Sequence, residues 1–272
     1  MDPALRLDDL APGDRDAAAR DWEDLRVHRV ASADDPDFAL GYDRLWEEFG
    51  ADGAMERRSV IAQRLAWDPA SPVGQARLAY EMLIFRRRGE IAAVRDHSAV
   101  VRLAVDGAPA PGPIVVHLSH ALVAPAHRGS GLAAWLRALP LGAARRCVSA
   151  ARRDAKTPVV LVAEMERDAR AAQRSYARAG FLKVDPAAAR YAQPDFRDPT
   201  LPPLPFELVL RRVGREDERE LPSAELEAIV DSIYAVYGAH VPDAALAPLR
   251  RAAAEWTRRH ATFRLVAPTS VS

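Results

Sequence analysis

The chain has 272 residues, of which 49% are hydrophobic, so it can bury a large core without the help of disulfides or metal ions. Its 38 basic side chains balance 38 acidic ones, which argues against nucleic acid or an anionic membrane as a partner. The single cysteine, Cys147, excludes an internal disulfide and a multi-cysteine zinc site, and we expect no metal ion. The first residues form no basic, apolar leader and no later stretch resembles a membrane span, so we expect a cytoplasmic protein.

The first half of the chain alternates strand and helix patterns after an N-terminal extension, residues 1–24. A strand is expected at 25–30, and Asp35-Pro36 then caps a helix with apolar residues at helical spacing. A second helix is expected at 55–67. Alternating apolar residues predict a hairpin, with strands at 78–84 and 90–94 and a turn at Arg88-Gly89.

The middle of the chain repeats a strand–helix pattern. We expect a flexible connection at 106–113, a strand at 114–123, and a helix from Gly131 that breaks near Pro140. A buried strand at 159–165, a helix at 167–179 and a strand at 206–210 follow, the last after a proline-rich crossing.

The loop after strand 114–123 has the features of an anion-binding site. Gly129 and Gly131 lack the Cβ atoms that would keep a phosphate away from the backbone, and the next helix begins with unpaired N–H groups. The loop has neither the Gly-Lys-Ser/Thr of a P-loop nor the Gly-x-Gly-x-x-Gly of a dinucleotide fold. It therefore predicts a pyrophosphate site of another kind.

Two motifs point to one family. The run Arg128-Gly129-Ser130-Gly131-Leu132-Ala133 resembles the Arg/Gln-x-x-Gly-x-Gly/Ala signature of the GNAT superfamily of acyl-CoA N-acyltransferases. The run Ser175-Tyr176-Ala177-Arg178-Ala179-Gly180-Phe181 is similar to the family's Leu-Tyr-x-x-x-Gly-Phe element. The resemblance covers residues 25–213 and implies an α/β (α+β) fold, in which helices flank a mixed, mostly antiparallel sheet that is splayed where the cofactor inserts.

The same resemblance implies the cofactor and its binding residues. The cofactor would be acetyl-CoA or another acyl-CoA, whose pyrophosphate would lie on the run Arg128, Gly129, Ser130, Gly131, Leu132 and Ala133. The pantetheine arm and the acyl carbonyl would be bound by main-chain groups of Ala121, Leu122 and Val123. Ala169 departs from the family, because many members carry an asparagine there that contacts the cofactor.

The resemblance also suggests catalytic groups. Tyr176 stands where many members have a tyrosine that protonates the departing sulfur; the alternative is a core tyrosine. His117 is the first candidate base, because strand alternation places it on the face of Ala121; the alternative is a hydrogen-bonded sheet histidine. The same alternation puts His120 on the opposite face, which argues against a shared metal ion. Glu81 and Glu164 are reserve bases that could orient a water molecule.

Residues 214–272 predict a C-terminal helical hairpin extension. Ser223 is the expected cap of its first helix, and the second runs from Pro242 to about His260. The apolar stripes favour docking on the protein's own core, although a homodimer surface or a wall of the acceptor site would also suit them.

These observations predict an N-acyltransferase, most simply one that moves an acetyl group from acetyl-CoA to a primary amine by direct attack in a ternary complex. The alternatives are a catalytically silent acyl-CoA-binding module that acts through a protein partner, and a transferase for a longer acyl group. The acceptor is open: a small amine, an antibiotic, an amino acid or a protein N-terminus. Carboxylates in the acceptor cleft would favour a polyamine or aminoglycoside, and arginines an anionic amino acid.

Overall fold

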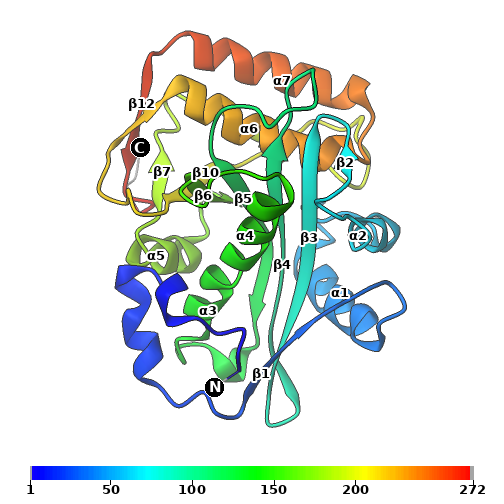
Figure 1. Ribbon diagram of the computed structural model, residues 1–272, viewed down its shortest axis with the longest axis vertical. Helices are drawn as coiled ribbons and strands as arrows, with labels where there is room; N and C mark the ends of the chain where they lie inside the picture. Colours follow the sequence, from blue (N-terminus) through cyan, green and yellow to red (C-terminus); the bar gives the residue numbers. More distant parts are fainter. Residues whose placement is uncertain (1, 270–272) are drawn as a thin grey trace.

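The computed structural model describes residues 2–269, which form a mixed sheet covered by helices on both faces (Figure 1). The ten-stranded sheet has the order β1-β3-β4-β5-β6-β10-β7-β12-β11, with β2 paired to β3 outside this path. Within residues 2–269, only β5 and β6 pair in parallel. The predicted mixed, mostly antiparallel sheet flanked by helices is therefore confirmed.

The strands of the large sheet are β1 (Leu25–Arg29), β2 (Pro72–Val73), β3 (Ala76–Arg87), β4 (Glu90–Arg102), β5 (Ile114–Val123), β6 (Val159–Met165), β7 (Leu182–Val184), β10 (Glu207–Arg212), β11 (Glu220–Pro222) and β12 (Thr262–Val266). A small separate sheet pairs β8 (Ala192–Gln193) with β9 (Leu204–Pro205). The α-helices are α1 (Pro36–Phe49), α2 (Arg58–Arg64), α3 (Leu132–Ala138), α4 (Leu141–Ala150), α5 (Arg170–Arg178), α6 (Ser223–Gly238) and α7 (Asp243–Arg258). Short 3-10 helices are η1 (Leu7–Asp9), η2 (Pro12–Ala19) and η3 (Pro125–His127).

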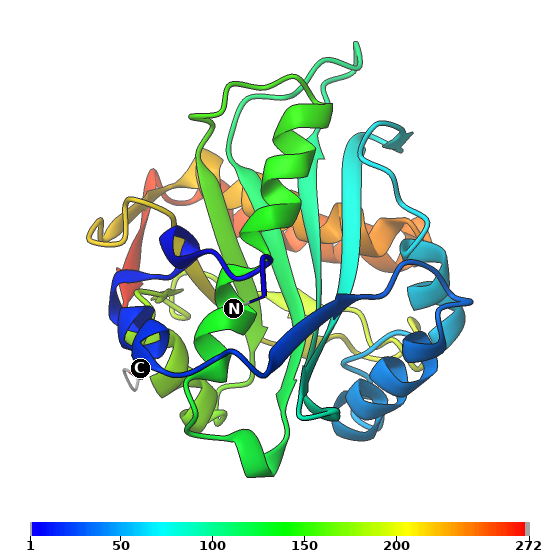
Figure 2. The ribbon, with the colours of Figure 1, turned by 60° about the horizontal axis from the view of Figure 1, so that its bottom comes forward.

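The period-two pattern of β3 divides the core between the two faces of the sheet. Tyr80 and Met82 pack with residues of α1 and α2, whereas Leu83 and Phe85 pack with residues of α3 on the other face. Figure 2 shows α3 and α4 across the sheet on the side opposite α6 and α7. No helix among the described residues is both long enough and apolar enough to span a membrane.

Local signals set several helix ends as expected. The Asp35 side chain accepts a hydrogen bond from the backbone N–H of Asp37 at 3.0 Å, at the start of α1. The helix that follows the glycine loop ends at Ala138, and Pro140 precedes α4, because proline cannot donate the next helical hydrogen bond. The second predicted helix is shorter than expected, at Arg58–Arg64.

The C-terminal segment is continuous with the core. Residues of α6 share one apolar cluster with Val160 and Val162 of β6, and β12 pairs with β7 of the large sheet. The two helices of the predicted hairpin are α6 and α7, and the segment also contains strands: the short run Thr262–Val266 is β12, which pairs with β7 and β11. Ser223 is the first residue of α6 rather than its cap, and its hydroxyl donates to the carbonyl of His260.

The N-terminal segment packs against α3 and α5 (Figures 1 and 2). The guanidinium of Arg137 in α3 binds both carboxylate oxygens of Asp14, at 3.0 and 2.7 Å, and donates to Ser175 of α5 at 2.9 Å. The rings of Trp22 and Trp135 meet edge to face, with centroids 6.4 Å apart. Arg137 therefore joins α3 both to the N-terminal segment and to α5.

Candidate active site

The large sheet opens between its two parallel strands. Pairing of β5 with β6 runs from Ile114 opposite Val159 to His117 opposite Val162 and ends there. From Leu118 to Val123 the edge of β5 that faces β6 has no partner strand among the described residues. Free main-chain groups on such an edge can bind an extended ligand as an added strand would.

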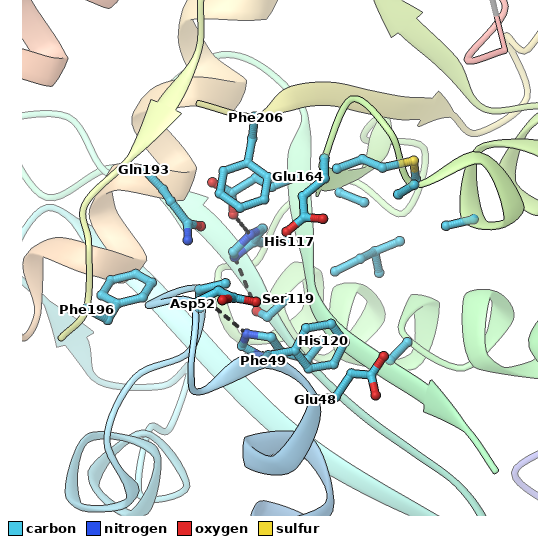
Figure 3. Close-up of a pocket in the computed structure, with 18 of the residues that line it drawn as sticks. Glu48, Phe49, Asp52, His117, Ser119, His120, Glu164, Gln193, Phe196 and Phe206 are labelled. Atoms are coloured by element: carbon cyan, nitrogen blue, oxygen red, sulfur yellow. Dashed lines mark hydrogen bonds and ion pairs between the residues drawn. The ribbon is translucent and has the colours of Figure 1, made fainter. Parts of the chain in front are cut away.

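A β-bulge lies at the same place. On the other side of β5, His120 is opposite Asp96 and His117 is opposite Ser98, so β5 contains one residue more than β4 over this stretch. The extra residue reverses the alternation of side chains. The expectation that His117 and His120 point to opposite faces is therefore wrong: both line the same cavity (Figure 3).

The cavity has a volume of about 470 Å³ and lies at the end of the paired stretch of β5 and β6. It gathers His117 and Ala121 from β5, Glu164 from β6 and Tyr176 from α5. These predicted site residues lie far apart in the sequence, and the opening of the sheet brings them together.

The His117 side chain is held between two partners. Its Nε2 lies 2.7 Å from Oε2 of Glu164, and its Nδ1 lies 3.3 Å from Oγ of Ser119. The hydroxyl of Tyr237 in α6 also donates to Oε2 of Glu164. Burial raises the pKa of Glu164, but the hydrogen bonds from His117 and Tyr237 outweigh this effect and hold the pKa below its ordinary value of 4.5.

A charged Glu164 sets the tautomer of His117. The carboxylate can only accept, so Nε2 carries the proton and Nδ1 keeps a lone pair that faces Ser119. This arrangement leaves His117 able to take a proton at Nδ1 while Glu164 stabilises the resulting imidazolium.

His120 is a different kind of histidine. Its Nδ1 lies 2.9 Å from Oδ1 of Asp96, whose Oδ2 accepts from the hydroxyl of Tyr80 at 2.7 Å. Burial lowers the pKa of His120, but the charge and hydrogen bond of Asp96 outweigh burial and raise that pKa to about 9. Burial likewise opposes ionisation of Asp96, yet His120 and Tyr80 lower its pKa to about 2. His120 is therefore cationic at neutral pH and cannot act as a base there.

Glu81 lies outside the cavity lining. Its carboxylate contacts Nε of Arg29 at 2.6 Å and Nε2 of His97 at 3.2 Å, and it also binds Arg146 of α4. The alternation of β3 turns this position toward α4, so the structure does not bring Glu81 together with His117 and Tyr176.

Tyr176 lies on the α5 wall of the cavity. Its ring meets Phe181 edge to face at a centroid distance of 4.8 Å, and the Arg137 guanidinium lies 5.6 Å from the ring centroid. Ala169 and Ala172 line the same cavity. These short side chains leave the space between β6 and α5 open.

The glycine loop continues from the free edge of β5. Gly129 and Gly131 have φ angles of 72° and 88°, which residues other than glycine rarely adopt. Gly131 is the N-cap of α3. A Cβ added at Gly129 would meet nothing within 4 Å, whereas one at Gly131 would lie 3.4 Å from Cβ of Ala17. The Arg128 Nε donates to the carbonyl of Val123 at 3.2 Å.

The remaining residues of the predicted cofactor run differ in exposure. Ser130 and Ala133 are half-buried, and the hydroxyl of Ser130 accepts from the N–H of Leu132 at 3.3 Å. The Leu132 side chain is buried, and the half-buried Leu122 packs against the apolar cluster beneath α1. Any contact of these two leucines with a ligand would therefore be made by their main chains.

Sequence reasoning did not identify the rest of the cavity wall. It includes Glu48, Phe49 and Asp52 at the end of α1, Glu56, Glu166 after β6, Gln193 and Phe196 near β8, Phe206, and Tyr237 of α6. Tyr237 belongs to a recognisable apolar stripe, but that stripe does not reveal which strand it covers. The others come from loops and helix ends that carry no short motif.

Comparisons with known proteins yield distant similarities. A candidate acetyltransferase of the GNAT family from Bacteroides thetaiotaomicron aligns with a TM-score of 0.41 and 15% identity, over 69% of this chain and 86% of that chain. A second candidate GNAT acetyltransferase, from Desulfovibrio desulfuricans, aligns with a TM-score of 0.37 and 15% identity, over 70% of this chain and 99% of that chain. No family model and no curated protein matches the chain. At these values the similarities assign neither a family nor an activity to this chain.

Proposed function

We propose that this protein is an acyl-CoA-dependent N-acyltransferase of the GNAT type, with acetyl-CoA as the simplest donor and a primary amine as acceptor. The observation that carries the proposal is the position of His117 and Glu164 at the point where β5 and β6 separate. The candidate base, an open strand edge and a cavity coincide there, and the glycine loop follows directly along the chain.

The residues present fit an acyl-CoA. The free edge of β5 at Ala121, Leu122 and Val123 would bind the extended arm through main-chain groups. The loop from Arg128 to Ala133 would lie under the pyrophosphate, since Gly129 leaves open space above its backbone. When bound, an acyl-CoA would supply an activated acyl group.

The side chains would then move the protons. The acceptor nitrogen forms an amide bond to the acyl carbon as the thioester C–S bond breaks, and Nδ1 of His117 takes the proton that the nitrogen loses, directly or through Ser119. Tyr176 would return a proton to the departing thiolate. Glu164 retains its charge throughout and holds the imidazole in place.

The binding part of this proposal is tested with Gly129→Glu. We expect calorimetry to show micromolar binding of acetyl-CoA to the wild-type chain, and at least tenfold weaker binding to the variant, because a carboxylate would meet the pyrophosphate. Gly107→Glu is the matched control, since Gly107 has a φ angle of 80° and equally open surroundings in the connection between β4 and β5. Absence of wild-type binding, or equal loss in both variants, would contradict the proposed site.

Tyr176→Phe tests the proton donor. We expect kcat for release of free thiol from acetyl-CoA to fall by about 10²-fold, the lower end for a general acid. Affinity for CoA should be unchanged, because phenylalanine keeps the ring contact with Phe181. An unchanged kcat would make Tyr176 a packing residue.

The same assay separates the alternatives. A silent binding module would bind acetyl-CoA and release no thiol with any amine. A transferase for longer acyl groups would have a higher kcat/KM with a longer acyl-CoA than with acetyl-CoA.

A further inference from the structure

The cavity beside His117 carries an excess of negative charge. Its lining includes the carboxylates of Glu48, Asp52, Glu56, Glu164 and Glu166, and among the described residues no lysine or arginine lines it. The identity of the acceptor follows from where these charges lie and which of them are already balanced.

Two of the carboxylates have partners. Glu56 forms a buried ion pair with Arg64, and Glu164 is bound by His117 and Tyr237. His120, which is cationic at neutral pH, also lies in the described part of the wall and is balanced by Asp96. The deep part of the cavity is thus close to neutral, apart from the charge of Glu164.

The outer carboxylates have no ion-pair partner among the described residues. Glu48, Asp52 and Glu166 are exposed side chains. The charge of Asp52 acts on the nearby guanidinium of Arg197, but that guanidinium is bound to both carboxylate oxygens of Asp195. In Figure 3, Glu48 and Asp52 lie on one side of His117, and Gln193 and Phe206 lie on the other.

A buried amide also faces the cavity without a full set of partners. Gln193 is 3% exposed, lines the cavity, and its Nε2 has no hydrogen-bond partner among the described residues, while its Oε1 lies 3.4 Å from the hydroxyl of Tyr237. That hydroxyl already donates its only proton to Glu164. If the amide is turned so that Nε2 donates to the oxygen of Tyr237, Oε1 faces the cavity, where a carbonyl oxygen can accept from an ammonium group.

The apolar part of the wall suits the same ligand. Phe49, Phe196 and Phe206 contribute aromatic rings, whose faces attract cations and whose edges pack against methylene chains. An anionic acceptor would meet repulsion from the outer carboxylates, and none of the described residues that line the cavity is an arginine that could bind it.

We infer that the acceptor is an aliphatic oligoamine: one amino group is presented uncharged to His117, and a second stays protonated between the carboxylates of Glu48 and Asp52. This inference rests on the proposed transferase function and narrows its substrate class. The transfer consumes one amine and one thioester and yields one amide and one free thiol, so no further reactant is needed.

The kinetic experiment compares putrescine with n-butylamine, which has the same carbon chain and lacks the second amine. With the full chain and acetyl-CoA, we expect kcat/KM for putrescine to exceed that for n-butylamine by at least about tenfold, and the advantage to shrink as salt is raised. The double variant Glu48→Gln, Asp52→Asn should reduce the advantage by about tenfold through KM. Glu47→Gln is the matched control, because Glu47 is 68% exposed on the same helix and does not line the cavity.

A binding measurement separates this inference from the proposed function. Calorimetry with spermidine and no acyl donor should show binding that weakens in the double variant and not in Glu47→Gln. No binding of spermidine, or a kcat/KM for n-butylamine or glutamate equal to that for putrescine, would overturn the inference while leaving a transferase intact. Spermidine binding without thiol release from any amine would uphold the ligand class and remove the transferase assignment.

Discussion

Replacing His117 with glutamine is expected to lower kcat/KM for acyl transfer by about 10²- to 10⁴-fold, the range that a positioned base contributes. Glutamine has no group that takes a proton at neutral pH, so the acceptor amine would have to lose its proton to water. Binding of CoA should be unaffected, because the free edge of β5 binds through its main chain. Initial rates of thiol release at saturating acetyl-CoA, together with calorimetry, would measure both quantities.

Glu164→Gln should lower kcat/KM by a similar factor, for a different reason. The new amide can donate to Nε2 of His117, and this favours the tautomer with the proton on Nδ1, which is the wrong one for a base that faces Ser119. Because the two residues act as one unit, the double variant should be little worse than either single variant. Additive losses would show that Glu164 and His117 act separately.

His260→Gln is the control for this series, since His260 is exposed near the end of α7 and does not line the cavity. If His117→Gln retains more than about a tenth of the wild-type kcat/KM, the assignment of His117 as base fails. A matching loss of CoA binding and of secondary structure would instead show that the substitution disrupts β5.

The second large effect concerns the free energy of unfolding, which depends on pH through the ion pair between His120 and Asp96. The folded state raises the pKa of His120 from 6.5 to about 9, so its proton stabilises the fold fully below pH 6.5, and this contribution is lost as the pH rises through 9. We expect the free energy of unfolding to fall by about 3 kcal/mol over this window. Asp96, with a pKa of about 2, stays charged throughout it.

Asp96→Asn removes this ion pair. Breaking a buried pair costs about 3–5 kcal/mol, so the variant should be less stable than wild type near pH 7, and the difference should narrow toward pH 9. Urea unfolding at a series of pH values would measure it. His97 and His240, whose pKa values burial lowers, lose their effect on stability above pH 6.5 and do not obscure the result. Parallel pH profiles for wild type and variant would contradict the assigned charges.

The sequence alone determined the order and type of most elements, because those signals are local. The cap at Asp35, the break at Pro140, the alternation in β3 and the glycines at 129 and 131 each act through a few neighbouring residues. The sequence also indicated His117, the proposed base, and its partner Glu164, because both lie in strongly apolar strands where a polar side chain is conspicuous.

Only the tertiary structure decided which of these residues meet. The bulge in β5 reverses a strict alternation without any motif, and thereby places His120 beside His117 while β3 carries Glu81 to the other face. The strand Thr262–Val266 exists through its partners β7 and β11. The carboxylates at the mouth of the cavity, Glu48, Asp52 and Glu166, come from a helix end and two loops. Their negative charges act together because the fold brings them close in space, and no sequence motif indicates this.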